Sequence, residues 1–306
     1  MAASCGLPFF YCHENNFLMI KSAWAKDKIL LIRFYAIPLV MSSSVHYYLP
    51  GADLIWLVTQ YESIRFEGKL ILTDRFVPRA DVAFVFHFKD TPVILEPKQI
   101  KLPPFFIAPV LRNSLTLEIS GILDTLVIAC LPSVLSRVLK IDLSPVDTLN
   151  IHLDHNKFYP LWKKMKELKS SEKRIACFSE YVNACQNQPY CPDIIDIAFR
   201  RIIENSISMP LSETLRSINL DVRTLQRSFL KRIGVSPKML ARIARVNYLW
   251  EEISKQKATT YQDLVFFGNY FDQTHFIKDF KNLVGEPPSH FFKRNLEVVK
   301  MISGRQ

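Results

Sequence analysis

The feature that most constrains the fold of this sequence is a pattern that occurs twice, 51 positions apart, within residues 211–292. The matched positions are Asp221, Leu225, Arg227, Phe229, Gly234 and Pro237 in the first copy and Asp272, Phe276, Lys278, Phe280, Gly285 and Pro288 in the second. A repeat of this length is longer than one helix and shorter than an ordinary domain. Each copy is therefore predicted to be a small helical unit within a pair.

The positive charge of the chain is concentrated in the part that contains the repeat. The formal net charge is +10, and residues 201–306 carry 17 Lys and Arg against 10 Asp and Glu, whereas residues 1–150 carry 14 against 13. Such an asymmetry favours a polyanionic partner, either nucleic acid or an acidic membrane surface.

Length and composition predict a folded protein in a reducing compartment. A chain of 306 residues with 49% hydrophobic composition can bury two cores. Its six cysteines are too few and too irregularly spaced for a disulfide scaffold. No basic stretch precedes an apolar one at the N-terminus, and the most apolar run, residues 29–41, is interrupted by Arg33 and Pro38. We therefore expect a soluble, cytoplasmic protein without a membrane helix.

Residues 1–145 have the pattern of a β-rich domain. Residues 114–119 alternate between apolar and polar side chains, as in a strand with one buried face. Residues 82–88 are apolar on nearly both faces, which fits a strand buried between two layers. The predicted fold of this part is an all-β barrel or sandwich.

The pattern becomes helical after about residue 144, and residues 146–192 are predicted to be a helical connector. Apolar residues from Leu161 to Leu168 recur at helical spacing among lysines, giving an amphipathic helix with a basic face. A solvated surface or a dimer contact explains that face better than a nucleic-acid reader does. Residues 193–306 then form a third, all-α region, whose first helix is expected to bury Ile194, Ile197, Ala198 and Ile202.

The first copy of the repeat, residues 211–233, is predicted to be a helix-turn-helix. Asn219 can adopt the turn conformation. Asp221 is placed to cap the second helix, whose expected buried stripe is Val222, Leu225 and Phe229. Two short helices joined by a tight turn, with the second one amphipathic, describe this motif.

The exposed face of that second helix carries side chains suited to DNA. Its first turns enter the major groove in this motif, where arginine binds guanine and glutamine binds adenine. Basic side chains further along suit phosphates. The predicted base-reading residues are Arg223, Thr224, Gln226 and Arg227, and the predicted phosphate contacts are Lys231 and Arg232. A merely solvated face is the alternative, which the recurrence in two copies disfavours.

The second copy, residues 260–283, has Gly268 and Asn269 at its turn and Asp272 as the cap of its second helix. That helix is predicted to expose Gln273, Thr274, His275 and Lys278. A helix over residues 237–255 joins the copies and spans roughly 28 Å at about 1.5 Å per residue. It could hold the two reading helices about one turn of DNA apart, roughly 34 Å.

These residues resemble the C-terminal domain of the AraC/XylS family of bacterial transcription regulators. The similar stretches are Asp221–Leu240 (DVRTLQRSFLKRIGVSPKML) and Phe271–Phe292 (FDQTHFIKDFKNLVGEPPSHFF), and the resemblance covers about residues 195–295. The base-reading positions of the family fall on Arg223, Gln226 and Arg227 and on Gln273, Thr274 and Lys278. The resemblance implies a sequence-specific regulator that binds double-stranded DNA, without enzymatic activity or a cofactor. RNA polymerase is a further candidate partner.

The second unit departs from the family pattern. Asn269 and Tyr270 stand where the family usually has Gly followed by Phe, and Val265 replaces a small Ala in the preceding helix. The bulkier Val265 is expected to alter how the two helices pack. We therefore expect most base discrimination from the first copy and more positioning from the second.

The N-terminal half resembles, more weakly, the β-rich, cupin-like sensor domains that precede such DNA-binding domains. The similar stretches are residues 76–88 and 105–121, with Arg79 and Ala80 in place of the usual Asp-Gly. The resemblance implies effector binding or dimerisation, so a homodimer through this domain or the connector helices is expected. An apolar effector would suit the aromatic residues Trp56, Phe84, Phe86, Phe105 and Phe106, although an ordinary packed core explains them better.

Two other classes of function compete with this one. A metal-binding enzyme would need a site such as His152 and His155 with Cys177, Cys185 and Cys191, but these spacings fit no zinc pattern. No phosphate-binding glycine loop is present either. A module that binds RNA or protein through the basic connector, without effector control, is the remaining alternative.

Overall fold

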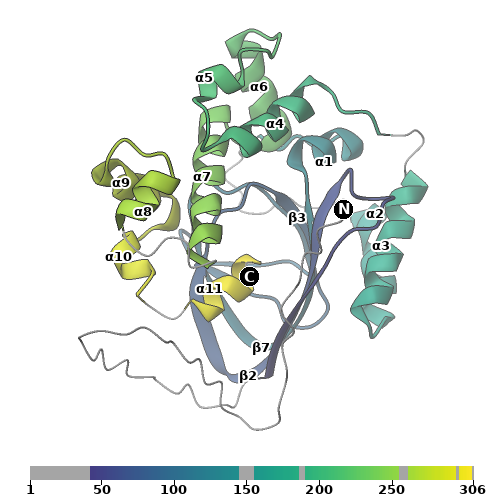
Figure 1. Ribbon diagram of the computed structural model, residues 1–306. Helices are drawn as coiled ribbons and strands as arrows, with labels where there is room; N and C mark the ends of the chain where they lie inside the picture. The colour runs from purple at the N-terminus through teal and green to yellow at the C-terminus, as the bar shows by residue number, and fades with distance from the viewer. Residues whose placement is uncertain (1–41, 145–154, 186–189, 255–260, 294–295, 305–306) are drawn as a thin grey trace, which may run out of the picture. The chain divides into compact units, whose positions relative to one another are not determined.

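The computed structural model describes residues 42–144, 155–185, 190–254, 261–293 and 296–304 (Figure 1). These described residues all belong to one compact unit. Its described strands are β1 (Ser42–Tyr48), β2 (Val58–Phe76), β3 (Val82–His87), β4 (Val93–Glu96), β5 (Ile100–Lys101), β6 (Phe105–Ala108) and β7 (Leu115–Cys130). Its described helices are α1 (Pro132–Leu139), α2 (His155–Glu167), α3 (Ser171–Cys185), α4 (Ile194–Asn205), α5 (Leu211–Thr214), α6 (Val222–Ile233), α7 (Pro237–Ser254), α8 (Tyr261–Phe267), α9 (Gln273–Val284), α10 (Pro288–Phe291) and α11 (Glu297–Ser303).

The strands of the described residues form one antiparallel sheet in the order β1-β2-β7-β3-β6, with β4 pairing to β7 and β5. The long strands β2 and β7 pair from Val58 opposite Cys130 to Phe76 opposite Leu115. Strand β3 pairs with the second half of β7, whereas β4 pairs with the first half. Both halves of β7 are thus covered on the side away from β2.

Strand β3 is buried on both faces, as its sequence predicts. One face carries Phe84 and Phe86, whose rings lie 5.3 and 6.3 Å from the ring of Phe178 on α3. The opposite face carries Ala83 and Val85, which belong to a separate cluster with Phe106. The sheet therefore has helices on one face and a second apolar layer on the other.

The connector helix α2 packs its apolar side against the sheet. Leu161 and Met165 are buried, and the Trp162 indole Nε1 donates to the carbonyl oxygen of His87 over 2.8 Å. Lys163 and Lys164 are exposed. The alternation of apolar and basic residues thus separates a packed face from a solvated one.

Helix α4 buries Ala198 and Ile202 as predicted, but not the other two residues of the predicted stripe. Ile194 and Ile197 are 37% and 39% exposed, whereas Ile195 and Phe199 are buried. Asp193 and Asp196 form a capping box, and the buried Asp196 carboxylate binds Arg137 and Arg232, so the face next to Asp196 packs inward. The predicted pairing of Ile194 and Ile197 with the core is therefore wrong.

The predicted fold class is confirmed, with a β-rich N-terminal region followed by an all-α C-terminal region. One departure is α1, a helix within the part predicted to be all-β. Pro132 begins this helix, and Lys140 ends it in the left-handed conformation. In the helical region α7 lies between the two units: α5 and α6 are near one end, and α8 and α9 lie beside the other (Figure 1).

Candidate nucleic-acid interface

Helix α6 is fixed at both ends by local interactions. The carboxylate of its N-cap, Asp221, accepts from the backbone N–H of Thr224 over 2.9 Å, and its C-cap, Gly234, is left-handed with φ 88°. Leu225 and Phe229 are buried as predicted, but Val222 is 71% exposed. The buried stripe begins at Leu225, so the first turn of the helix projects beyond the core. The expectation of a buried Val222 is wrong.

Helix α9 repeats this construction 51 residues later. Asp272 accepts from the backbone N–H of His275 over 2.7 Å, and Gly285 is left-handed with φ 87°. Phe276 and Phe280 are buried. Both helices have 12 residues. The repeat therefore encodes the same helix twice, with the same two ends.

The turns that precede the two helices differ. In the second unit Asn269 is left-handed with φ 48°, and its side-chain amide donates to the carbonyl oxygen of Ile207 over 2.8 Å. In the first unit Asn219 has no such conformation, and α5 begins after Pro210 without a side-chain cap. The turn predicted at Asn219 is therefore made without a left-handed residue.

The exposed faces of the two helices carry nearly all the residues predicted to contact DNA. Half-buried Thr224 is the exception among the first turns of both helices. Within the described residues, none of the exposed arginines and lysines in this set forms an ion pair. The exposed members are Arg223, Gln226, Arg227 and Lys231 on α6 and Gln273, Thr274, His275 and Lys278 on α9.

Arg232 differs from the expectation of a phosphate contact. Its guanidinium forms salt bridges with Asp193 and Asp196 of α4 and donates to the carbonyl oxygen of Ser133 on α1 over 2.7 Å. Arg137 of α1 binds the same two carboxylates over 3.3 and 3.2 Å. Burial raises the pKa of Asp193. The hydrogen bond from Arg232 and the positive charge of its guanidinium outweigh burial and lower that pKa on balance. Arg232 thus ties α6 to α4 and α1, and it is not available on the outer face.

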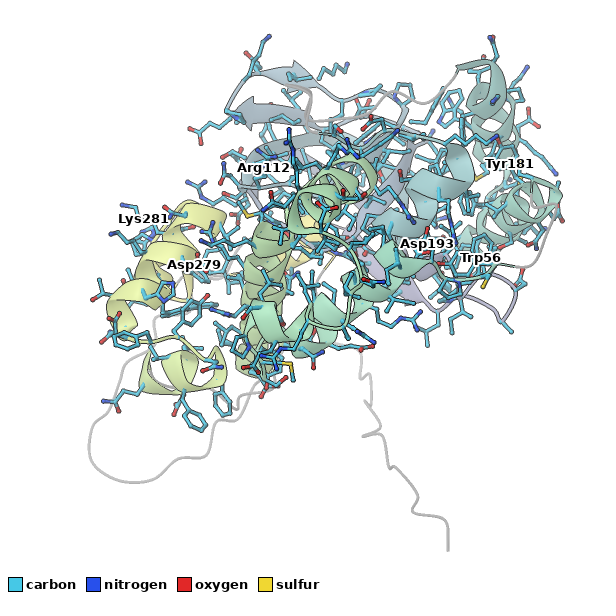
Figure 2. All side chains as sticks on the ribbon, turned by 90° about the horizontal axis from the view of Figure 1, so that it is seen from above. Trp56, Arg112, Tyr181, Asp193, Asp279 and Lys281 are labelled. Carbon is cyan, nitrogen blue, oxygen red and sulfur yellow. The ribbon has the colours of Figure 1, made fainter. Side chains whose placement is uncertain are left out.

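A polar network that the sequence did not reveal supports α9. The Tyr270 hydroxyl donates to the Asp279 carboxylate over 3.0 Å, and Arg242 of α7 forms a salt bridge with the other oxygen of Asp279. Asp279 is 6% exposed, while Lys281, two residues on, lies at the surface (Figure 2). Burial, followed by the charge of Asp279, raises the pKa of Tyr270. Tyr270, a departure from the family pattern, is therefore the residue that joins α9 to its turn.

The C-terminal ends of both helices meet the sheet region. At the end of α6, the backbone N–H of Leu143 donates to the carbonyl oxygen of Lys231 over 2.8 Å. At the end of α9, Ser114 donates from its backbone to Leu283 over 2.8 Å and from its hydroxyl to Val284 over 2.7 Å. Equivalent ends of the repeat are thus held by two different parts of the N-terminal region.

A cavity of about 120 Å³ lies on the face of the sheet opposite α2 and α3. Alternate residues of β3 and β7 line it, including Val85 and Leu115. The aromatic residues that would suit an apolar effector were Trp56, Phe84, Phe86, Phe105 and Phe106. Of these five, only Phe106 lines the cavity. Phe84 and Phe86 pack on Phe178, Phe105 lies 6.0 Å from Trp162, and Trp56 stacks on Tyr190 at 5.1 Å.

The last described helix, α11, packs beside this cavity. Its Ile302 and Ser303 contribute to the lining, and the Ser303 hydroxyl accepts from the backbone N–H of Val77 over 2.9 Å. Arg79 donates to the carbonyl oxygens of Ser303 and Gly304 over 3.3 and 3.2 Å. A helix that follows the repeat in sequence thus belongs to the wall of the sheet cavity.

Among the described residues no group of three or more His, Cys, Asp or Glu side chains could hold a metal ion. His152 and the apolar run 29–41 lie outside the described residues. Across the same described part of the chain, none of the helices has the length and apolarity needed to cross a membrane.

Residues 215–294 match the family described as a helix-turn-helix domain, which is of the AraC type. The match spans α6, α7, α8 and α9 and both exposed faces. With the two equivalently capped helices, it defines a DNA-binding transcription regulator of the helix-turn-helix class. More narrowly, residues 215–294 are a helix-turn-helix domain of the AraC type, and the resemblance seen in the C-terminal part of the sequence is confirmed.

Comparison with curated proteins gave no match. Among solved structures, ToxT from Vibrio cholerae is similar with 12% identity and a TM-score of 0.41, covering 83% of this chain and 98% of that one. A ToxT structure from strain SCE256 with an unsaturated fatty acid bound has 13% identity, a TM-score of 0.42 and coverages of 86% and 96%. The AraC-like transcriptional activator CuxR has 12% identity, a TM-score of 0.24 and coverages of 70% and 87%. TM-scores of this size support no inference about this chain.

Proposed function

We propose that the protein recognises specific sequences in double-stranded DNA by placing α6 and α9 in the major groove. The observation that carries the proposal is the pair of helices with equivalent caps, each with an outer face whose polar side chains have no ion-pair partner within the described residues. Arg223, Gln226 and Arg227 would read base edges from α6. Gln273, Thr274 and Lys278 would do so from α9, with Lys231 on a phosphate and Thr224 and His275 beside the backbone.

The length of α7 supports a single binding face. Its 18 residues, at about 1.5 Å each, span roughly 27 Å. Successive major grooves on one side of DNA are about 34 Å apart. Two reading helices near the ends of α7 could therefore enter adjacent grooves of one duplex. The domain limits proposed for this arrangement remain residues 193–306 for DNA binding, with 1–145 and 146–192 before them.

Control by a small effector is the second part of the proposal. It is supported by the sheet cavity and by the presence of Ile302 and Ser303 in its lining. A molecule bound there would contact both the sheet and the C-terminal helix, so its affinity could differ between two arrangements of the protein. A homodimer and a contact with RNA polymerase belong to the same proposal.

The test is to map sites bound by the purified full chain across genomic DNA fragments, followed by affinity measurements in rising salt. A sequence reader should recover one recurrent motif whose half-site spacing is constant. Its affinity should fall steeply with salt while its preference over unrelated duplexes persists. Uniform binding to all fragments, or stronger binding to single-stranded RNA than to duplex DNA, would refute the proposal in favour of a general nucleic-acid binding module.

A further inference from the structure

The residue that precedes the N-cap aspartate is apolar in both units, but only the first unit packs it. In many helices an apolar side chain at this position packs against the fourth residue of the helix, which fixes how the chain enters. In the first unit these two residues are Leu220 and Leu225. Leu225 is buried, and Leu220 is partly buried against the same core cluster. Leu220 is therefore part of the core of the first unit.

In the second unit the corresponding residue, 51 positions later, is Phe271, and it is left in solvent. Phe271 is 94% exposed, and its ring contacts no other ring within the described part of the chain. Tyr270, one position earlier, packs instead. It is 6% exposed, and its ring lies 5.3 Å from that of Phe276, the fourth residue of α9. Because Tyr270 fills the packing role, the fold of the second unit does not need the Phe271 ring.

Phe271 stands at the end of α9 that is proposed to enter the major groove. It directly precedes Asp272, whose carboxylate accepts from the backbone N–H of His275 over 2.7 Å. Gln273 and Thr274, which follow this cap, are both exposed. The N-terminal residues of the second helix of this motif contact base edges, and consecutive Cα atoms are only about 3.8 Å apart. Phe271 is therefore close enough to reach base pairs beside those that Gln273 and Thr274 would contact.

The chemistry of a phenyl ring limits what it can recognise in the major groove. The ring offers no conventional hydrogen-bond donor or acceptor to a polar base edge, so a favourable contact there requires an apolar group. Thymine alone among the four bases presents a methyl group in the major groove, at its C5 position. Contact between the ring and this methyl group removes apolar surface from water and breaks no hydrogen bond.

We propose that Phe271 contacts the 5-methyl group of a thymine and so selects a T·A base pair in the part of the operator that α9 reads. The inference rests on the proposed DNA-binding function and adds an apolar residue to its polar base readers. Burying one methyl group corresponds to about 0.8 kcal/mol, or about fourfold in affinity. This preference is smaller than the one expected from Arg227, so the first unit stays the stronger reader.

Replacement of thymine by deoxyuridine tests the contact, because it removes the methyl group and leaves base pairing unchanged. Each thymine of the motif recovered by genomic mapping is replaced in turn, and the affinity of the full chain is measured for each duplex. For the natural protein, one replacement in the part read by α9 should weaken binding by about fourfold. For Phe271→Ala, the same replacement should change the affinity by less than about twofold.

Two further variants show whether the effect belongs to this ring. Phe271→Leu keeps an apolar side chain and should keep most of the preference for thymine over uracil. Phe266→Ala removes another exposed phenyl ring of the same unit, on α8 and 81% exposed, and should keep the full preference. Because Phe266 and Phe271 both lie at the surface, none of these substitutions is expected to unfold the protein.

The outcomes separate this inference from the proposed function. A recurrent motif in which no thymine methyl group affects binding would overturn the inference and leave sequence-specific recognition intact. If Phe271→Ala keeps the natural ratio of affinities for the thymine and uracil duplexes, the ring does not read that methyl group and the inference is wrong. Absence of any recurrent motif would refute the proposed function and this inference with it.

Discussion

The two units of the repeat share one construction and differ in what supports it. Helices α6 and α9 have equal lengths, equivalent aspartate caps and equivalent left-handed glycines. Yet α6 is tied through Arg232 to α4 and α1, whereas α9 is tied through Asp279 to α7 and to Tyr270. Arg232 has Leu283 as its equivalent in the second copy, and Asp279 has Ser228 in the first.

This difference separates what the repeat must conserve from what it can vary. The caps and glycines set where a helix begins and ends, and they recur because both units need a helix of the same length. The tertiary supports act on faces that meet different neighbours. The first reading helix is therefore coupled to α4 by ion pairs and to α1 by hydrogen bonds of Arg232, and the second is coupled to the connecting helix α7.

The largest expected effect is the loss of the support that only the second unit has. Asp279→Ala leaves Arg242 and the Tyr270 hydroxyl without their partner, and removing one member of a buried ion pair should cost about 3 kcal/mol. Ser228→Ala, at the equivalent position of the first unit, should change stability by less than about 0.5 kcal/mol. Denaturant unfolding of both variants measures the contrast. Equal losses would show that the two units depend on the same supports.

The next effect concerns base reading at equivalent positions. Arg227→Ala should cost about 1–3 kcal/mol on a cognate operator and relax base preference at one position. Lys278→Ala, its counterpart, should cost less and affect all sequences more evenly. Selection from a randomised duplex library, with binding constants for the recovered sites, compares them. If both variants lost specificity equally, the ranking of the first unit above the second would fail.

A smaller effect is expected from a charge that positions the protein. Lys231→Ala should weaken binding to all sequences about equally and lower the dependence of log affinity on log salt by about 1. Lys163→Ala, on the exposed basic face of α2, should leave that slope unchanged. A lower slope for the Lys163 variant would instead place the connector helix on the nucleic acid.

The smallest effect is the pH dependence of the first cap. Hydrogen bonds from the Thr224 side chain and backbone lower the pKa of Asp221 below its usual value of 3.8. A carboxylate with a lowered folded-state pKa stabilises the fold above its unfolded pKa, and this contribution is lost as the pH falls through the folded value. Asp221→Asn should remove this part of the acid sensitivity. Unfolding curves between pH 2 and pH 6 compare it with the natural protein, and identical curves would show that the cap charge contributes nothing.

Local features of the sequence predicted the N-caps of α6 and α9 correctly. Asp221 and Asp272 cap by bonding to a backbone N–H three residues on, and a contact of that range is visible in a pattern of letters. The two faces of β3 were equally readable, because strand side chains alternate. Asp279 could have been noticed as well, since it is an acid within a buried helical stripe with a tyrosine nine positions earlier.

Contacts between residues far apart in the chain could not be predicted from the sequence. The partners of Arg232 lie 36 to 99 positions away, so nothing nearby distinguished it from the exposed Lys231. The exposure of Ile194 and Val222 depends on which distant elements pack against their helices, and the local pattern does not show this. Alternation predicted the apolar wall of the sheet, but it could not show that the wall leaves a cavity or that α11 reaches it.

The placement of α11 has a consequence for dissecting the protein. By position in the chain this helix follows the second unit, yet Met301 packs with Ile64, Phe66 and Ile119 of the sheet. A fragment that begins at α4 would expose the apolar side of α11 to water. A fragment that ends after β7 would lack the part of the cavity wall that α11 supplies. Helix α11 therefore joins the C-terminal region to the sheet, and neither region is expected to keep its native structure when it is produced alone.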